Sequence, residues 1–192
     1  MPIFIKSVTA AVAAAVLLAV VAVPAYADND PVSATVTAGG LTAQVTGATL
    51  SSVALDGTSV KHATGPASGI WKITDARGTG AAWGLTASGT DFTSAAGDTD
   101  LTPRTLPVGN LLITPGIISS GAGSDAAPQG TPITVSSQPQ VIVSATGNFK
   151  GTFSLTPNFD LTVPGNAFRS NFVSGTSGAV NPYIATLTLT IA

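Results

Sequence analysis

The chain has 192 residues, enough for one domain with a sizeable core, and only 8% of them are charged. Seven Lys and Arg stand against nine Asp with no basic stripe, which argues against nucleic acid or anionic lipid as a partner. The chain contains no cysteine, which excludes disulfides, thiolate catalysis and zinc–thiolate sites.

The first segment has the three parts of a secretory signal peptide. Lys6 supplies a positive start, residues 8–23 form an apolar run broken only by Thr9, and Ala25 and Ala27 make a small-residue cleavage site. The alternative, a retained membrane anchor, needs about 20 apolar residues, and this run is shorter. We expect residues 1–27 to be removed, leaving a secreted chain of residues 28–192 in which no segment is long and apolar enough to span a membrane.

Strand patterns begin directly after the leader. Residues 32–38 and 41–45 alternate apolar and polar side chains on either side of a Gly-Gly pair, which predicts a hairpin. Residues 50–55 and 58–62 flank an Asp-Gly pair, a strong turn dipeptide, and predict a second hairpin.

The most distinctive stretch is residues 69–87. It contains the unit Trp-x-Ile/Leu-Thr twice, once at Trp71 and once at Trp83. A hairpin centred near Arg77 would place the two indole rings opposite each other. In each unit the Trp and the aliphatic residue two positions on share a face.

The second half of the chain carries further strand patterns between irregular segments. Residues 88–110 are polar and irregular, and residues 115–130 form a Gly/Ala/Ser/Pro-rich surface loop. The expected strands are residues 111–114, 140–146 (with Val141 and Val143 on one face), 149–155, 159–163 and 183–191. The last of these lacks Pro and charged residues, which predicts a central position in its sheet.

These patterns define the expected fold class. About ten short strands, with turns between them and no helix after the leader, predict an all-β protein with an antiparallel β-sandwich. Residues 28–192 are expected to form a single domain, and the only long helix is expected within the signal peptide.

The chain offers little catalytic chemistry. His62 is the only histidine, and its place at a strand end favours an exposed side chain over a catalytic one. Asp91, Asp98 and Asp100 are a weak alternative as Ca²⁺ ligands, against a solvated acidic loop. We therefore expect no enzyme activity, no cofactor and no metal.

Two motifs in the chain resemble the WxL-domain family of Gram-positive surface proteins. Trp83-Gly84-Leu85 matches the family's proximal Trp-x-Leu and follows a family-like stretch at residues 74–80. Tyr183, Leu187 and Thr188 match the distal motif, in which Leu189 replaces the family's Trp and Ile191 its Leu. The resemblance extends from about residue 32 to residue 192.

The resemblance implies a protein of the cell surface, held non-covalently at the cell wall through peptidoglycan. The binding residues carried over are Trp83, Leu85, Tyr183 and Leu187, with Trp71 from the repeated unit. The alternative for these residues is packing in the sandwich core, since Trp-x-Leu in a strand places both side chains on one face.

A second function stays open from the residues alone. Low charge, Thr-rich strands and unpaired sheet edges are typical of a secreted structural or adhesive subunit of an extracellular assembly, whose partners would be other surface proteins.

Overall fold

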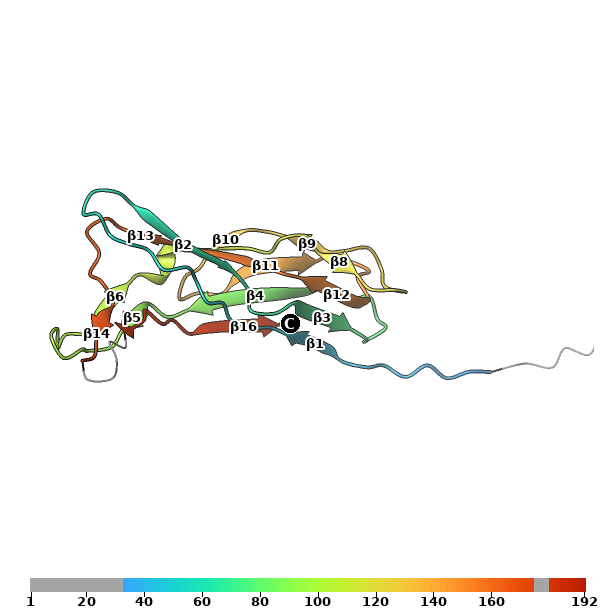
Figure 1. The fold of residues 1–192 in the computed structure, drawn as a ribbon. Coiled ribbons are helices and arrows are strands. Elements are labelled where there is room, and N and C mark those ends of the chain that lie inside the picture. The colour runs from blue at the N-terminus through green and yellow to red at the C-terminus, as the bar shows by residue number, and fades with distance from the viewer. Residues whose placement is uncertain (1–32, 175–179) are drawn as a thin grey trace, which may run out of the picture. The chain divides into compact units, whose positions relative to one another are not determined.

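The computed structural model describes residues 33–174 and 180–192 (Figure 1). It divides into two units, Met1–Val36 and Thr37–Ala192. In the first unit the described residues, 33–36, are exposed and have no regular secondary structure. The predicted signal peptide lies outside the described residues, and every described strand belongs to the second unit.

One layer of the fold consists of two four-stranded groups with the orders β1-β3-β12-β8 and β10-β7-β13-β2 (Figure 1). Along the chain β2 leads into β3, β7 into β8 and β12 into β13, and these strands follow the same relative order in the two groups, β3-β12-β8 and β2-β13-β7. The strands are β1 (Leu41–Gln44), β2 (Lys61–Pro66), β3 (Trp71–Asp75), β7 (Leu111–Thr114), β8 (Ser119–Ser120), β10 (Ile133–Thr134), β12 (Gly151–Leu155) and β13 (Asn158–Val163).

The second layer is a four-stranded sheet with the order β16-β4-β11-β9. Two small strand pairs, β5-β6 and β14-β15, and one 3-10 turn, η1, complete the described elements. Their bounds are β4 (Trp83–Gly89), β5 (Phe92–Ser94), β6 (Arg104–Leu106), η1 (Val108–Asn110), β9 (Gln129–Gly130), β11 (Gln140–Ala145), β14 (Asn171–Phe172), β15 (Val180–Asn181) and β16 (Leu187–Ile191).

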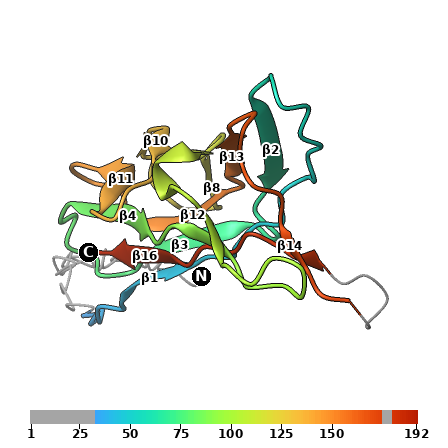
Figure 2. The same ribbon diagram turned by 90° about the vertical axis from the view of Figure 1, so that its left-hand side faces the viewer.

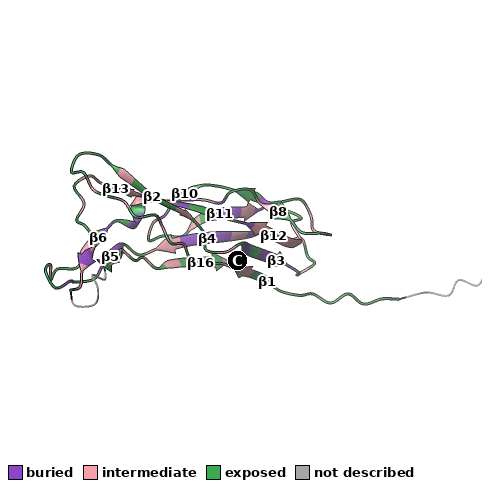
Figure 3. Ribbon diagram, in the orientation of Figure 1, coloured by how far each residue is buried: buried purple, intermediate pink, exposed green. Residues whose placement is uncertain are grey.

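The core lies between the two layers. Trp83 and Leu85 of β4 are buried, and the Trp83 ring packs against Phe153 of β12 with 5.8 Å between ring centroids. Trp71 of β3 meets Phe159 edge to face at 6.2 Å. Figure 3 shows the buried residues gathered on the central strands. The chain is all-β with antiparallel sheets, and the predicted β-sandwich class is confirmed. It has sixteen described strands rather than about ten, because several consist of two residues.

The first predicted hairpin is wrong. Among the described residues, 33–38 form no strand, and β1 pairs with β3 instead. The Gly39 N–H donates to the Ala76 carbonyl (2.8 Å), and the Ala76 N–H donates to the Gly40 carbonyl (3.0 Å). The glycine pair therefore continues the β1–β3 ladder instead of turning. A Cβ on Gly39 would lie 2.7 Å from that of Ala76, so the glycine allows this close approach.

The second predicted hairpin has its turn but not both of its strands. Gly57 adopts a φ of 76°, and the Asp56 carboxylate accepts the N–H groups of Thr58 (3.0 Å) and Ser59 (2.8 Å). Residues 50–55 have no strand assignment and run as an irregular edge beside β2, where the Ser51 N–H donates to the Thr64 carbonyl (2.8 Å).

The predicted pairing of the two tryptophans is also wrong. Trp71 lies opposite Leu155 and Trp83 lies opposite Ala145, so the two units of the repeat belong to different layers. The physical reason is that both Trp faces are core faces. The chain between them crosses from one layer to the other, and each ring reaches the core from its own side.

Two expectations about individual strands need correction. A register shift between Val141 and Val143 breaks the alternation of β11, so Val141 is 48% exposed while Val143 is buried. β16 ends its sheet and is not central. Its lack of charge reflects half-buried apolar side chains that face the core, with Thr188 and Thr190 exposed on the other face.

Candidate functional site

A groove of about 1110 Å³ opens into the core between two edge segments of the sandwich. One wall is formed by residues 45–53, which flank β2. The other wall includes residues 182–185 together with Leu187 and Leu189 of β16. Core residues of β7 and β13, among them Leu111 and Leu161, form its floor. Figure 2 shows β2 and β13 in the upper part of the view, above β16 and β14.

The wall at β16 carries a free sheet edge. Within the described residues β16 pairs only with β4. The Gly84 N–H donates to the Ala192 carbonyl (2.8 Å), and the Ala192 N–H donates back to the Gly84 carbonyl (3.2 Å). Because hydrogen-bonded and non-hydrogen-bonded pairs alternate in an antiparallel ladder, the N–H and C=O groups of Leu187 and Leu189 point away from β4. Their side chains are half-buried against the core.

Tyr183 and Phe168 both line the groove. The Tyr183 hydroxyl donates to the Phe168 carbonyl (3.0 Å), and burial raises the pKa of the Tyr183 phenol above its ordinary value. The Arg104 guanidinium lies 3.7 Å from the centre of the Phe168 ring and is held by Asp100, with Nε to Oδ2 at 2.7 Å. The Arg104 bond is the largest cause of a lowered pKa for the Asp100 carboxyl. Polar contacts around an aromatic ring therefore fix this part of the groove lining.

The structure separates the predicted binding residues, four from the family motifs and Trp71 from the repeated unit, into two sets. Trp71, Trp83 and Leu85 lie in the core, with at most 4% of each residue exposed. The Trp71 indole N–H donates to the Thr46 carbonyl (2.9 Å), and that of Trp83 donates to the Phe149 carbonyl (3.1 Å). Neither ring presents a face that could stack on a sugar. Tyr183 and Leu187, by contrast, line the groove.

The stretch before the proximal motif is held by an ion pair. Asp75 is buried at the end of β3 and accepts Nε and Nη2 of Arg77, each at 3.0 Å, as well as the Arg77 backbone N–H. Arg77 Nη2 also donates to the Ala81 carbonyl (2.8 Å), which closes the turn. The Arg77 guanidinium holds the pKa of the Asp75 carboxyl below its ordinary value. This pair sets where the chain leaves one layer for the other.

The three aspartates weighed as Ca²⁺ ligands have separate partners. Asp91 accepts the Val108 N–H (2.9 Å), Asp98 accepts the N–H and hydroxyl of Ser174, and Asp100 pairs with Arg104. Within residues 33–174 and 180–192, no three acidic or histidine side chains lie close enough together to hold a metal ion.

His62, the histidine expected at a strand end, lies in β2 with its side chain 55% exposed. Its Nδ1 lies 2.8 Å from an Asp160 carboxylate oxygen of the neighbouring strand β13. No serine completes a hydrogen-bonded chain with this pair in the described part of the protein.

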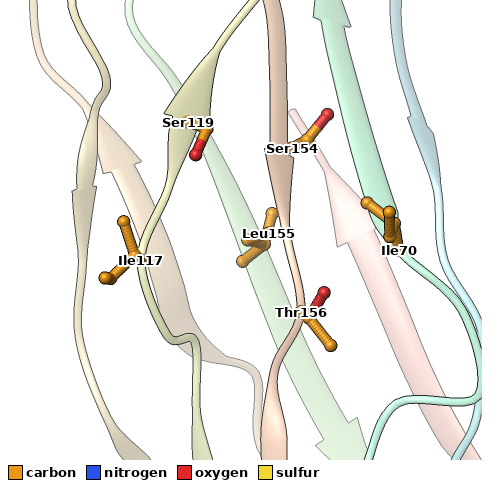
Figure 4. A pocket seen from close by; sticks show the side chains of 6 residues that line it. All are labelled: Ile70, Ile117, Ser119, Ser154, Leu155 and Thr156. Atoms are coloured by element: carbon orange, nitrogen blue, oxygen red, sulfur yellow. The ribbon is translucent and has the colours of Figure 1, made fainter.

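A second, shallower depression of about 370 Å³ lies on the outer side of β12. Ile70 and Ile117 lie on opposite sides of Leu155 there (Figure 4), and they are 67% and 88% exposed. The hydroxyls of Ser119, Ser154 and Thr156 are its only polar side-chain groups. It offers apolar surface without a charged group to orient a ligand.

The groove is the part of the site that sequence patterns missed. The irregular wall at residues 45–53 has no clear strand period, and the uncharged β16 reads as a central strand. The lack of charge and Pro in β16 also fits an edge strand that another segment covers, and this was the signal that could have indicated the groove.

No protein-family model, curated protein or solved structure matches this chain. In the portion of the chain that the structure describes, no helix has the length and apolar character needed to cross a membrane.

Proposed function

We propose that this chain is an exported, non-catalytic cell-surface protein, held at the cell wall through peptidoglycan by a WxL-like domain. The observation that carries the proposal is the pairing of the two motif segments. Leu85 lies opposite Ile191, and Ala87 lies opposite Leu189, in the ladder between β4 and β16. Segments far apart in the sequence thus form one structural unit, as a bipartite binding motif requires.

In this proposal the buried and accessible motif residues have different roles. The Trp83 and Leu85 side chains fix β4 in the core, so they position the distal strand rather than touch the wall. The groove would contact the wall, because Tyr183 offers an aromatic ring with a hydroxyl there and Arg169 offers a positive charge. Aromatic faces and hydrogen-bonding groups together are suited to sugar and peptide ligands.

A pelleting assay on purified peptidoglycan tests the proposal. The exported protein is compared with Tyr183→Ala and with the control Val141→Ala, which alters an exposed apolar side chain of β11 that does not line the groove. Circular dichroism establishes that each variant is folded. We expect saturable recovery of the wild type and the control, and reduced recovery of Tyr183→Ala. Equal recovery of all three proteins would mean that Tyr183 and its groove do not contact the wall. Recovery of none of them would contradict the proposal.

The free edge of β16 favours a second candidate, a structural or adhesive subunit of an extracellular assembly. An apolar edge strand with no charge, Pro or bulge is open to pairing with another polypeptide. Sedimentation velocity over a range of concentrations, with cross-linking at the cell surface, tests this function. A strict monomer that captures no partner would argue against it.

A further inference from the structure

We propose that the groove beside β16 accepts residues 33–38 of a second copy of this chain as an added strand, joining the copies head to tail. The inference rests on the second candidate function, because it names the partner that covers the free edge. It competes with the wall contact proposed first, because a strand that fills the groove would cover residues assigned to that contact, such as Arg169.

The acceptor is the groove along Leu187 and Leu189 of β16. The backbone groups of Leu187 and Leu189 point away from β4, so an added strand would find donors and acceptors already aligned. The half-buried side chains of β16 lie beside the groove, and the floor is apolar. Of the described residues that line the groove, only Arg169 is charged. An uncharged segment with apolar side chains on one face fits these surroundings best.

The donor segment has that character. Ala34, Val36 and Ala38 alternate with Ser33, Thr35 and Thr37, and the segment carries no charge. It has the period of a half-buried strand, yet it is exposed and forms no strand in this structure, and Val36 is 95% exposed. Six extended residues span about 20 Å, which covers the five residues of β16.

The backbone around Gly39 argues that the occupant comes from another copy. Residues 39–40, which join the segment to β1, bond to Ala76 and continue the β1–β3 ladder. A turn there would break both bonds. A tight hairpin at these residues would also place Val36 opposite Ala43 of β1 and reach only to about Thr46, leaving most of the wall at residues 45–53 uncovered.

Donor and acceptor are different surfaces of one chain, so the contact is heterologous. Each copy that receives a strand still has its own residues 33–38 to donate. Such contacts generate open chains of copies unless the rotation closes a ring. The expected product is therefore a ladder of multimers and not a single dimer.

The absence of cysteine gives a clean cross-linking test. The double variant Val36→Cys/Leu187→Cys of the exported protein is treated with a short bifunctional maleimide, which tolerates small shifts in register. We expect a ladder of covalent multimers on a denaturing gel. The matched control Thr35→Cys/Leu187→Cys places the first thiol on the opposite face of the added strand and should give a much weaker ladder. A cross-link within single chains, or equal ladders for both variants, would overturn the proposal.

A second test leaves the groove unaltered. Val36→Lys should abolish concentration-dependent association in sedimentation velocity, while the neighbouring Thr35→Lys should retain it. A synthetic peptide of residues 31–40 should then raise the Tm of the Val36→Lys protein, and the same peptide carrying Val36→Lys should not.

Two outcomes distinguish failure of the self-assembly from failure of the structural or adhesive subunit function on which it rests. If the wild type is a monomer, and its single variant Leu187→Cys cross-links to a different surface protein, the self-assembly is overturned and the subunit function stands. A monomer with no partner at all would overturn both.

Discussion

Replacing Trp83 separates a packing role for the proximal motif from a binding role. The ring is buried, packs against Phe153 and donates its N–H to the Phe149 carbonyl. Truncation of a buried Trp to Ala costs about 3–5 kcal/mol of unfolding free energy, because it removes apolar contacts and leaves a cavity. Since small domains are stable by about 5–15 kcal/mol, Trp83→Ala should fold only marginally.

The informative variant is Trp83→Phe. It keeps an aromatic ring in the core but leaves the Phe149 carbonyl without its indole donor, which costs about 1–2 kcal/mol. Urea unfolding followed by far-UV circular dichroism measures both losses without relying on tryptophan emission. Trp71→Phe serves as the matched control, because its indole N–H likewise donates to a backbone carbonyl, that of Thr46.

Two results would refute this reasoning. A loss below about 1 kcal/mol for Trp83→Ala would mean that the ring is not packed as described. A folded Trp83→Phe protein that no longer pellets with peptidoglycan, while Trp71→Phe still does, would mean that the Trp83 indole itself contacts the wall.

Three further outcomes are expected. Asp75→Asn should cost about 1–3 kcal/mol of unfolding free energy. Because the pKa of Asp75 is lowered in the folded protein, its carboxylate stabilises the fold above the ordinary carboxyl pKa, and this stabilisation is lost as the pH falls toward the folded pKa. The unfolding free energy of the variant should therefore fall less steeply than that of the wild type during acid titration. Ile142→Ala should cost about 2–5 kcal/mol in urea unfolding, whereas Val141→Ala should stay within about 0.5 kcal/mol, contrary to simple alternation along β11. Gly39→Val should cost about 1–3 kcal/mol in thermal unfolding, since its Cβ collides with the facing turn, and an unchanged Tm would contradict that contact.

The sequence predicted the kind of structure well because its signals are local. The strands predicted at residues 111–114, 149–155 and 159–163 include Ile113, Phe153 and Leu161, and all three lie in the core. Alternation along a strand depends only on which face of the strand is buried, so it can be recognised without knowing which strands pair.

Strand pairing was harder to predict because it depends on distant segments. Nothing near Trp71 indicates that its partner is Leu155, and the repeated Trp units suggest a hairpin that does not exist. The bulge in β11 likewise adds one residue that no pattern marks.

The candidate site was predicted only in part. Tyr183 and Leu187 were chosen for their motif, and they do line the groove. Trp83 and Leu85 of the same motifs, and Trp71 of the repeated unit, lie in the core. A motif records which residues recur together, but it does not distinguish those that hold a strand in place from those that face a ligand.

The ladder between β4 and β16 also constrains the order in which the molecule can form. It joins Leu85 to Ile191, about a hundred positions away, so a chain made from its amino end must wait for its last strand. Until then one flank of β4 stays unpaired beside apolar core residues, a state prone to aggregation. The β4 ladder can therefore be completed only once Leu187–Ile191 has been made, and a nascent chain shorter than that would leave this edge of β4 exposed.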